Sequence, residues 1–476
     1  MTRRAWVRLD NASNIFLAAR SDADSKVFRM SAELDHDVAA ELLQEALDEV
    51  YDRYPLYHAV LRRGVFWHYL QDSDLRPTVT PDQQHTCAPI YLPDRRNLLF
   101  RVVYYRRRVV LEVFHALSDG TGALWFLSDL LNAYTRRSSP SADAPADTHN
   151  GRSTARPHGT IEPRSDAAAP RHALTADSFA QYFRGKAEDV KSQAAKFSDA
   201  AAPPVLEVED DIGTDRPLRR RSWLRPSFMN VFHPRGTRTS DNRTRAVELT
   251  VPTKELLGLA KALEVSPTMY LTALFFESIR RSSGGLGKKR TLSASIPVNL
   301  RQFFPSTSSR NFFATVTVRH SYGEGRDDID AVAKGLDEQF RPKATPEALE
   351  RKLRKLIRAE RTLVLRVLPR PVKDVLLRLI NWGNNRGISV AVSNLGRVTL
   401  PEPAASHVGR MLFHVAAVRP QFCAVSHGEN LTISFTSPFI EIDHVKEFAR
   451  MLTQQNMHVT VAAARVTEEE LAEQDL

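Results

Sequence analysis

The sequence has little cysteine and no long apolar run. Its 476 residues include two cysteines, Cys87 and Cys423, which lie far apart and outside any metal-ligand spacing. This excludes a disulfide framework and a zinc site built from cysteines. No stretch approaches the roughly 18 to 20 unbroken apolar residues that span a bilayer. The basic N-terminus is interrupted by Arg8 and Asp10 before the apolar core of a signal peptide develops. We therefore expect a cytoplasmic protein in a reducing compartment.

The chain has an excess of basic residues, and these are spread along its length. The 66 Lys and Arg residues outnumber the 56 Asp and Glu residues, which gives a net charge of +10. An excess of this kind suits an anionic partner such as a phosphorylated cofactor, a nucleic acid or a lipid headgroup. Because arginine is scattered along the chain, most of this charge is expected to be solvated surface. We expect no nucleic-acid partner.

Changes in composition divide the chain into four parts. Residues 1–135 and 246–476 mix strands and amphipathic helices without the strict alternation of a doubly wound sheet. Residues 136–204 are rich in Ser, Ala, Pro, Asp and Arg and poor in large apolar residues, which predicts a disordered linker. Residues 205–245 form a basic connecting segment, with an Arg cluster at 219–225. We predict an α/β (α+β) fold of two lobes, each a mixed sheet with helices, and a ligand cleft between the lobes.

Two basic amphipathic helices are predicted within residues 346–382. The first has an apolar face and a face of Arg and Lys. A membrane surface could bind such a helix. A helix packed on the core with a solvated basic side explains the same pattern. Both explanations stay open, and peripheral membrane contact through 346–382 is one expectation.

One apolar run ends in a histidine. The run 109–114 is rich in β-branched residues, which predicts a strand, and a helical pattern starts shortly after Gly120. His115 shares a strand face with three apolar residues and should point into the protein. Histidine has an unperturbed pKa that suits proton transfer near neutral pH. Asp119 has the charge to fix a partner, and Gly120 permits the backbone geometry of a sharp strand-to-helix turn. A satisfied core histidine is the alternative.

The spacing His115-x-x-x-Asp119-Gly120 resembles the HxxxDG motif of the chloramphenicol acetyltransferase-like superfamily. That superfamily includes alcohol acyltransferases, plant acyltransferases, polyketide-associated acyltransferases and peptide synthetase condensation domains. Further segments resemble the family in the order that it shows: Asp52-Arg53-Tyr54-Pro55, Asn299-Leu300-Arg301, Arg310-Asn311-Phe312-Phe313, Ser393-Asn394-Leu395-Gly396 and Thr432-Ile433-Ser434-Phe435. The resemblance covers nearly all of the chain except 136–204. It is closest to bacterial alcohol acetyltransferase-like proteins.

The resemblance implies a role for each motif residue. His115 would be the general base that takes a proton from an acceptor as the acceptor attacks a thioester carbonyl, with no covalent enzyme intermediate. Asp119 would be structural and would pair with Arg301 in the other lobe, which fixes the turn that aims His115. The oxyanion or substrate contacts would come from Asn311, Ser393 or Asn394, and the sequence leaves this choice open.

Three functions follow as alternatives. The first is an acyltransferase that moves an acyl group from a thioester to an alcohol. The second is a condensation enzyme that forms an amide, and the third is a non-catalytic binding module that keeps the fold. The complete motif weighs against the third. The resemblance implies acyl-CoA or a phosphopantetheinyl thioester on a carrier protein as co-substrate, no tightly bound cofactor, no metal and a small-molecule or lipid acceptor. We expect a monomer.

Overall fold

The structure is a computed structural model of the chain. It describes residues 5–463 except 10, 22, 66, 94, 139–159, 162–173, 175–230, 240 and 361–369. Most of the predicted linker, the Arg cluster at 219–225 and the middle of the predicted helical region 346–382 therefore lie outside the described residues.

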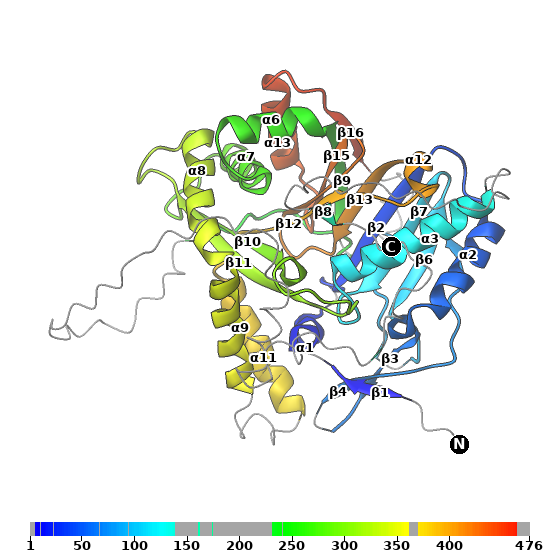
Figure 1. Cartoon of the computed structure of the whole chain (residues 1–476). Coiled ribbons are helices and arrows are strands. Elements are labelled where there is room, and N and C mark those ends of the chain that lie inside the picture. Colours follow the sequence, from blue (N-terminus) through cyan, green and yellow to red (C-terminus); the bar gives the residue numbers. More distant parts are fainter. Residues whose placement is uncertain are drawn as a thin grey trace, which may run out of the picture.

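Within the described residues, the N-terminal lobe is built on a five-stranded sheet (Figure 1). The strand order is β13-β2-β7-β6-β5, with β13 (Val408–Val415), β2 (Val27–Leu34), β7 (Arg108–Phe114), β6 (Phe100–Tyr105) and β5 (Thr80–Pro81). Helices α2 (Ala40–Asp52) and α3 (Gly120–Ser138) pack together beside this sheet. Helix α2 buries residues at spacings of three and four, as an amphipathic helix does: Leu43, Ala46, Leu47, Val50 and Tyr51.

A smaller group of elements lies next to this sheet. Strands β1 (Trp6–Arg8), β4 (His68–Gln71) and β3 (Val60–Arg63) form a three-stranded antiparallel sheet. Helix α1 (Asn11–Ala19) follows β1, and the short helix η1 (Pro55–His58) follows α2. Helix α1 is important for the site because it carries Phe16.

The C-terminal lobe is built on a larger sheet. Its strand order is β11-β10-β12-β14-β15-β9-β16, and β8 pairs beside β12. The strands are β8 (Thr160–Ile161), β9 (Arg245–Pro252), β10 (Thr291–Asn299), β11 (Phe313–Ser321), β12 (Val390–Val398), β14 (Gln421–His427), β15 (Asn430–Ser437) and β16 (Thr460–Ala463). Helices of the same half include α6 (Thr253–Ala262), α7 (Pro267–Ser282), η2 (Leu300–Gln302), α8 (Ile329–Phe340), η3 (Arg341–Lys343) and α13 (Asp443–Gln454).

Helix α7 is the centre of this half. The Ser266 hydroxyl caps its first turn by accepting a hydrogen bond from the Met269 N–H, and Pro267 occupies the first helical position. Eleven consecutive residues of α7, Met269 to Ile279, are buried, because α8 and α13 cover the helix beside the sheet.

Strand β14 joins the two cores. Its side chains alternate between the two faces of the sheet, as in any strand. Phe422 and Ala424 are buried in the core that contains α7, whereas Cys423 and Val425 are buried in the core of the N-terminal lobe. The larger sheet therefore has helices on one face and the N-terminal lobe on the other.

Two findings differ from the predicted domain boundaries. Strand β13 comes from the range assigned to the C-terminal lobe, but it pairs with β2 and completes the first sheet. Within the range predicted as linker, 160–161 pair with β12 and Leu174 is buried, while 136–138 continue helix α3. These differences arise from pairing and packing between segments distant in sequence, which local composition does not encode.

A buried charge cluster also ties the lobes together. Arg108 of β7 donates two hydrogen bonds to Glu248 of β9, at 2.9 and 3.2 Å. His414 of β13 places its Nε2 3.4 Å from Glu248 Oε1. Burial alone would raise the pKa of Glu248, but His414 and Arg108 outweigh it and lower this pKa to about 2.

This lowered pKa gives a pH dependence of stability. Because the folded-state pKa lies below the ordinary value of 4.5, the ionised Glu248 stabilises the fold above about pH 4.5, and this stabilisation is lost as the pH falls toward about 2. We expect Glu248→Gln to lower the free energy of unfolding by about 3 kcal/mol at pH 7 and to flatten its pH dependence below pH ~4.5. Urea unfolding at a series of pH values measures both effects. The exposed Glu429, changed to Gln, is the control and should change neither; an equal loss in both variants would contradict the role of Glu248.

The remaining helices differ in how they meet the core. Helix α9 (Pro346–Glu360) buries Leu349 and Leu353 in the C-terminal core, which agrees with a core-packed helix at its start. Helix α11 (Arg370–Asn385) instead packs on α1. Among the described helices, none has the length and hydropathy to cross a membrane.

Candidate functional site

His115 lies directly after strand β7, where the two lobes meet. Its backbone N–H donates to the Lys26 carbonyl at 2.8 Å, so the chain is still paired with its neighbour at this point. Three aromatic rings surround the partly buried imidazole. Phe16 stacks on it at 3.9 Å between ring centroids with 14° between the planes, Phe28 meets it edge-on at 5.0 Å, and Phe313 lies at 5.9 Å.

Asn311 fixes which nitrogen of His115 carries the proton. The Asn311 side-chain N–H₂ donates to the His115 carbonyl at 2.7 Å and to the Ser13 hydroxyl at 2.9 Å. A carbonyl only accepts, so this contact sets the orientation of the amide. The Asn311 Oδ1 then faces His115 Nδ1 at 3.2 Å, and Nδ1 must be the donor. The lone pair of the neutral ring is therefore on Nε2.

The surroundings of His115 keep the ring neutral. Burial lowers the pKa of His115 to about 4, and the nearby negative charge of Asp119 raises it by a smaller amount. At neutral pH the imidazole is unprotonated, so Nε2 can accept a proton.

Asp119 is the anchor of the turn that follows His115. Its Oδ1 accepts a hydrogen bond from the Gly122 N–H at 2.9 Å, which caps the start of helix α3. Its Oδ2 accepts from the Arg301 guanidinium at 2.7 Å and from the Phe312 N–H at 2.8 Å. The exposed fractions of the Asp119 and Arg301 side chains are 7% and 6%, so this is a buried ion pair between the lobes.

Arg301 also shapes the segment that carries Asn311. Its guanidinium donates to the Ser308 carbonyl at 2.7 Å and to the Arg310 carbonyl at 2.6 Å. These contacts close the loop between η2 and β11. One arginine therefore joins the turn after His115 to the loop that presents Asn311 to the imidazole ring.

The glycines of the turn are required for space. Gly120 was expected to supply an unusual backbone geometry, but its φ is not positive; a Cβ at this position would lie 2.9 Å from the Leu395 side chain. Gly122 is more constrained, because a Cβ there would lie 2.2 Å from the Ser309 carbonyl oxygen and 2.4 Å from the Ser118 hydroxyl. Gly122 was not predicted as a site residue, because the HxxxDG motif contains only Gly120.

Adding a methyl group at Gly122 should therefore destabilise the protein. We expect Gly122→Ala to lower the free energy of unfolding by about 1 to 3 kcal/mol, because the backbone of the 309 segment would have to move. Gly258→Ala in helix α6 is the matched control, since nothing lies within 4 Å of a Cβ there. The control should be neutral or more stable by about 0.5 to 1 kcal/mol. Denaturant unfolding measures both variants, and equal stability of the two would contradict the close approach.

Comparison with known proteins identifies the fold. No protein-family model matches the sequence, and no curated protein matches it. A trichothecene 15-O-acetyltransferase from Fusarium sporotrichioides is similar in structure with a TM-score of 0.57 at 9% identity, over 95% of this chain and 94% of its own. The first condensation domain of the calcium-dependent antibiotic synthetase, with a substrate analogue, gives 0.52 at 14% over 94% of each chain. A protein of F. sporotrichioides in complex with coenzyme A and T-2 gives 0.52 at 12%, over 96% of this chain and 99% of its own.

The chain has the chloramphenicol acetyltransferase-like fold. The expected two lobes of mixed α and β structure are confirmed. In this chloramphenicol acetyltransferase-like fold the HxxxDG segment lies at the junction of the two lobes, and residues of both lobes surround His115.

The side chains of Asn394 and Ser393, the other two predicted contacts, point to opposite faces of strand β12. Asn394 of β12 donates to the Thr268 hydroxyl at 2.9 Å and accepts from the Gly396 N–H, so its side chain is engaged at the start of helix α7. Ser393 directly precedes Asn394 in the strand and therefore points to the opposite face. Its register partner Cys423 belongs to the N-terminal core, so Ser393 faces the junction of the lobes. Neither residue is hydrogen-bonded to His115 in the described part of the chain.

Phe16 is one contact of His115 that no sequence motif predicted. It belongs to α1, a short helix without charged side chains, and no motif marks it. Its ring covers one face of the imidazole and leaves the ring edge, which carries both nitrogens, to its other neighbours. A run of small and apolar residues gave no signal for this contact.

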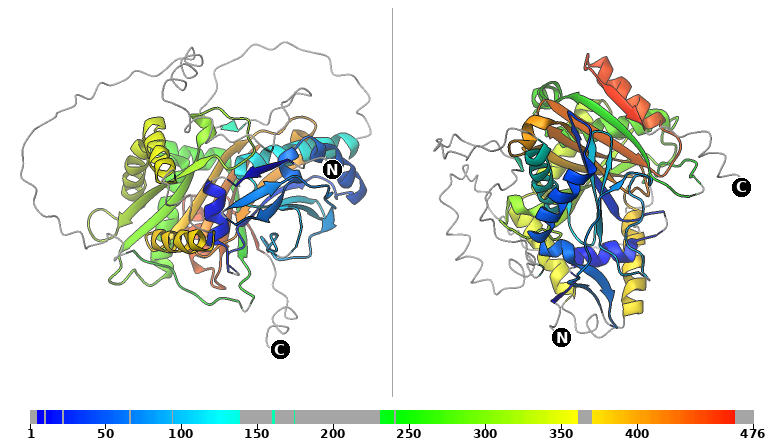
Figure 2. Two further views of the ribbon diagram at one scale, coloured as in Figure 1. Left: turned by 90° about the horizontal axis from the view of Figure 1, so that it is seen from below. Right: turned by 90° about the vertical axis from the view of Figure 1, so that its right-hand side faces the viewer.

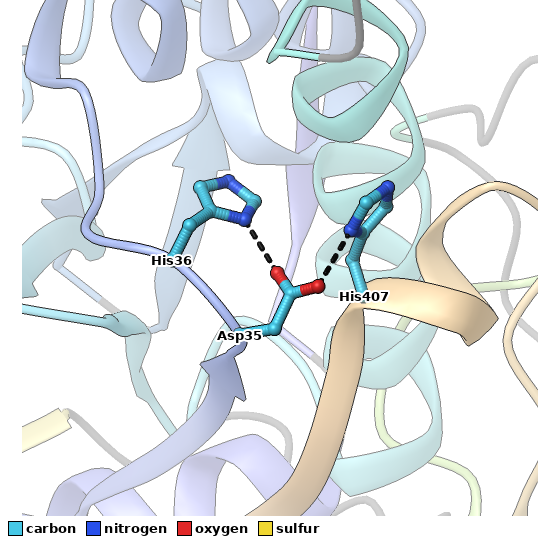
Figure 3. A group of neighbouring side chains, drawn as sticks. All are labelled: Asp35, His36 and His407. Atoms are coloured by element: carbon cyan, nitrogen blue, oxygen red, sulfur yellow. Dashed lines mark hydrogen bonds and ion pairs between the residues drawn. The ribbon is translucent and has the colours of Figure 1, made fainter.

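A second cluster of polar side chains lies away from His115. Figure 3 shows Asp35 between the imidazoles of His36 and His407, whose Nδ1 atoms lie 2.5 and 3.0 Å from different carboxylate oxygens. The three ligand atoms are within 4.8 Å of one another, a spacing that could hold a metal ion. Burial would raise the pKa of Asp35, but the hydrogen bonds from both imidazoles outweigh it and lower this pKa. The cluster links the end of β2 to helix α12 (Ala404–His407).

A cavity of about 540 Å³ lies in the C-terminal lobe, between the end of helix α7 and the start of helix α13. It is lined by apolar side chains and by a few charged ones, among them Lys288, Lys289 and Glu441. None of the predicted site residues lines it. The predicted site residues therefore lie apart from this cavity.

Proposed function

We propose that the protein is an acyltransferase that moves an acyl group from a thioester to the hydroxyl of an acceptor, with His115 as the general base. The observation that carries this proposal is the fixed tautomer of His115. Asn311 accepts from Nδ1, which leaves the Nε2 lone pair directed away from this partner and free to take a proton. The low pKa keeps the ring in this neutral form at physiological pH.

The proposed reaction is an acyl transfer with two proton transfers, and neither a metal nor a redox cofactor takes part in it. The acceptor oxygen attacks the thioester carbonyl carbon while its proton passes to His115 Nε2. The resulting tetrahedral intermediate collapses with cleavage of the C–S bond, and the proton moves from Nε2 to the sulfur. The products are an ester and a free thiol. In the transient imidazolium, the Asn311 carbonyl and the negative charge of Asp119 stabilise the positive ring.

The contacts of His115 support direct transfer between the two substrates, without a covalent intermediate on the enzyme. Ser118, the hydroxyl residue nearest to it in the turn, donates to the Ser309 carbonyl at 2.5 Å and is therefore engaged. The described contacts of the His115 side chain are with Asn311 and three aromatic rings, and none is with a cysteine or serine. Rate enhancement would then come from orienting two bound substrates and from proton transfer.

Ser393 is the proposed donor to the oxyanion. The amide groups of Asn311 and Asn394 each donate elsewhere, whereas the partly exposed Ser393 faces the junction of the lobes. We propose acyl-CoA or an acylated carrier protein as the donor. A neighbour in complex with coenzyme A and a neighbouring condensation domain support both donors equally.

Release of free thiol tests the proposed function. Purified protein is incubated with acyl-CoAs of increasing chain length or with acylated carrier protein, together with alcohol and amine acceptors, and thiol is followed over time. We expect thiol release that depends on an alcohol and an ester product by mass spectrometry. If transfer occurs only to amines and gives an amide, the protein is an amide-forming condensation enzyme and not an ester-forming acyltransferase. No transfer with any donor would contradict an acyltransferase.

A further inference from the structure

Helix α11 turns its apolar side chains toward solvent. Six large apolar residues of this helix are between 38% and 58% exposed: Val372, Val375, Leu376, Leu379, Ile380 and Trp382. They recur at spacings of three and four residues and so lie on one side of the helix. The polar side chains of Lys373, Asp374 and Asn381 are less exposed than these apolar ones. A surface helix normally buries its apolar side, and α11 does the reverse.

The exposed patch continues onto helix α1. The two helices pack against each other, and Arg378 Nε of α11 donates to the Ala18 carbonyl of α1 at 3.4 Å. Ile15 of α1 is 46% exposed. In Figure 2, α11 runs along the outer edge of the molecule. We call these six residues and Ile15 the α11 surface. Seven exposed apolar side chains on two helices that pack together indicate a binding surface.

The charges at the α11 surface are mostly positive. Of the charged side chains described on α11 or directly after it, Lys373, Arg378 and Arg386 are basic and Asp374 is acidic. The Arg386 guanidinium stacks on the Trp382 ring at 3.7 Å. Apolar side chains combined with basic residues and a terminal tryptophan are the features of a helix that lies in a membrane interface. We propose that the α11 surface docks on an anionic phospholipid bilayer.

The dimensions and the charges favour a bilayer over a second copy of the chain. The 16 residues of α11 extend over roughly 24 Å, which suits a helix lying along the interface. Long basic side chains can place their stems along apolar surface and their charges among anionic headgroups. Self-association through the same surface would instead bring the basic residues of two copies together, and like charges repel.

The α11 surface lies close to His115, and this proximity indicates which class of acceptor could reach the site. Helix α1 contributes Ile15 to the α11 surface and stacks Phe16 on the His115 ring. Adjacent side chains on one short helix thus contact the bilayer and the site. This step rests on the proposed function: the acceptor is a lipid alcohol that reaches His115 from the docked bilayer.

Co-sedimentation with vesicles tests the docking. The vesicles contain phosphatidylcholine alone or with about one third phosphatidylglycerol. We expect the full-length protein to bind the anionic vesicles, and Leu379→Glu to lower the ratio of bound to free protein by roughly tenfold or more. Leu257→Glu, at a 45% exposed position on helix α6, is the matched control and should bind like wild type. Circular dichroism checks that both variants are folded.

Three outcomes would overturn the docking proposal. These are no binding to anionic vesicles, equal binding of Leu379→Glu and wild type, or a dimer in size-exclusion chromatography that Leu379→Glu dissociates. Turnover of a vesicle-borne alcohol and of a short soluble alcohol tests the link to the acceptor, and Leu379→Glu should lower only the first. His115→Ala should still bind vesicles. A failure of the proposed chemistry is therefore distinguishable from a failure of docking.

Discussion

His115→Ala is expected to abolish most acyl transfer while the protein stays folded. Removing a general base typically lowers the rate by about 10² to 10⁴. The free energy of unfolding of the alanine variant should stay within about 1 kcal/mol of wild type, because the ring is only partly buried and the main-chain contacts of residue 115 to Lys26 and Asn311 remain. Thiol release under saturating donor measures the effect. His458→Ala, at an exposed position outside the site, is the control. Full activity of His115→Ala would contradict the assignment.

The pH dependence gives a second readout for the same residue. Since the pKa of His115 is lowered to about 4, activity should be flat near neutral pH and should fall as the pH drops through about 4. Asn311→Asp places a negative charge beside Nδ1, which should raise the pKa of His115 and move this fall to higher pH. A structural role of Asn311 alone would lower activity without moving the profile.

Loss of the ion pair between Asp119 and Arg301 is the second large effect. We expect Asp119→Ala and Arg301→Ala each to lower the free energy of unfolding by about 3 to 5 kcal/mol, because each leaves a buried charge without its partner. Both should also lose solubility and activity, since the turn after His115 and the loop of Asn311 depend on the pair. Urea unfolding and thiol release measure the two effects.

A double-mutant cycle separates the pair from its surroundings. In the double variant the second substitution should cost less than it does alone, with a coupling of about 0.5 to 3 kcal/mol. Asp119→Asn and Arg301→Gln keep the side-chain volumes and serve if the alanine variants do not fold. The exposed pair Arg76–Asp52 is the control, with a coupling of about 0 to 1 kcal/mol. Simple additivity at Asp119 and Arg301 would show that the two charges do not stabilise each other.

The sequence predicted those parts of the site that local pattern encodes. The β-branched run before His115 forms strand β7, and the polar turn after it is followed by helix α3, as expected from the periodicity. The contact between Asp119 and Arg301 was implied by the family motif, and the structure places these side chains 2.7 Å apart. A motif transfers such a pair because both residue types and their order along the chain are visible in the sequence.

Other parts depend on contacts that no local pattern carries. Asn311, Ser393 and Asn394 were equivalent candidates, and only the side to which each strand or loop turns its side chain distinguishes them. Phe16 covers the imidazole through the packing of a nine-residue helix. The sequence of strand β13 has no feature that distinguishes it from the strands of the larger sheet. Its pairing with β2 in the first sheet could therefore not be predicted from composition.

The placement of β13 limits how the two lobes can move. This strand belongs to the first sheet, and only the five residues 416–420 separate it from β14 of the second sheet. A connection that short limits how far the two sheets can separate, and the ion pair of Arg108 in β7 with Glu248 in β9 also joins the lobes. Wide hinge opening would have to break strand pairing. Substrates should therefore reach the uncovered edge of the His115 ring through motions of smaller parts, such as helix α1, and not through a wide separation of the lobes.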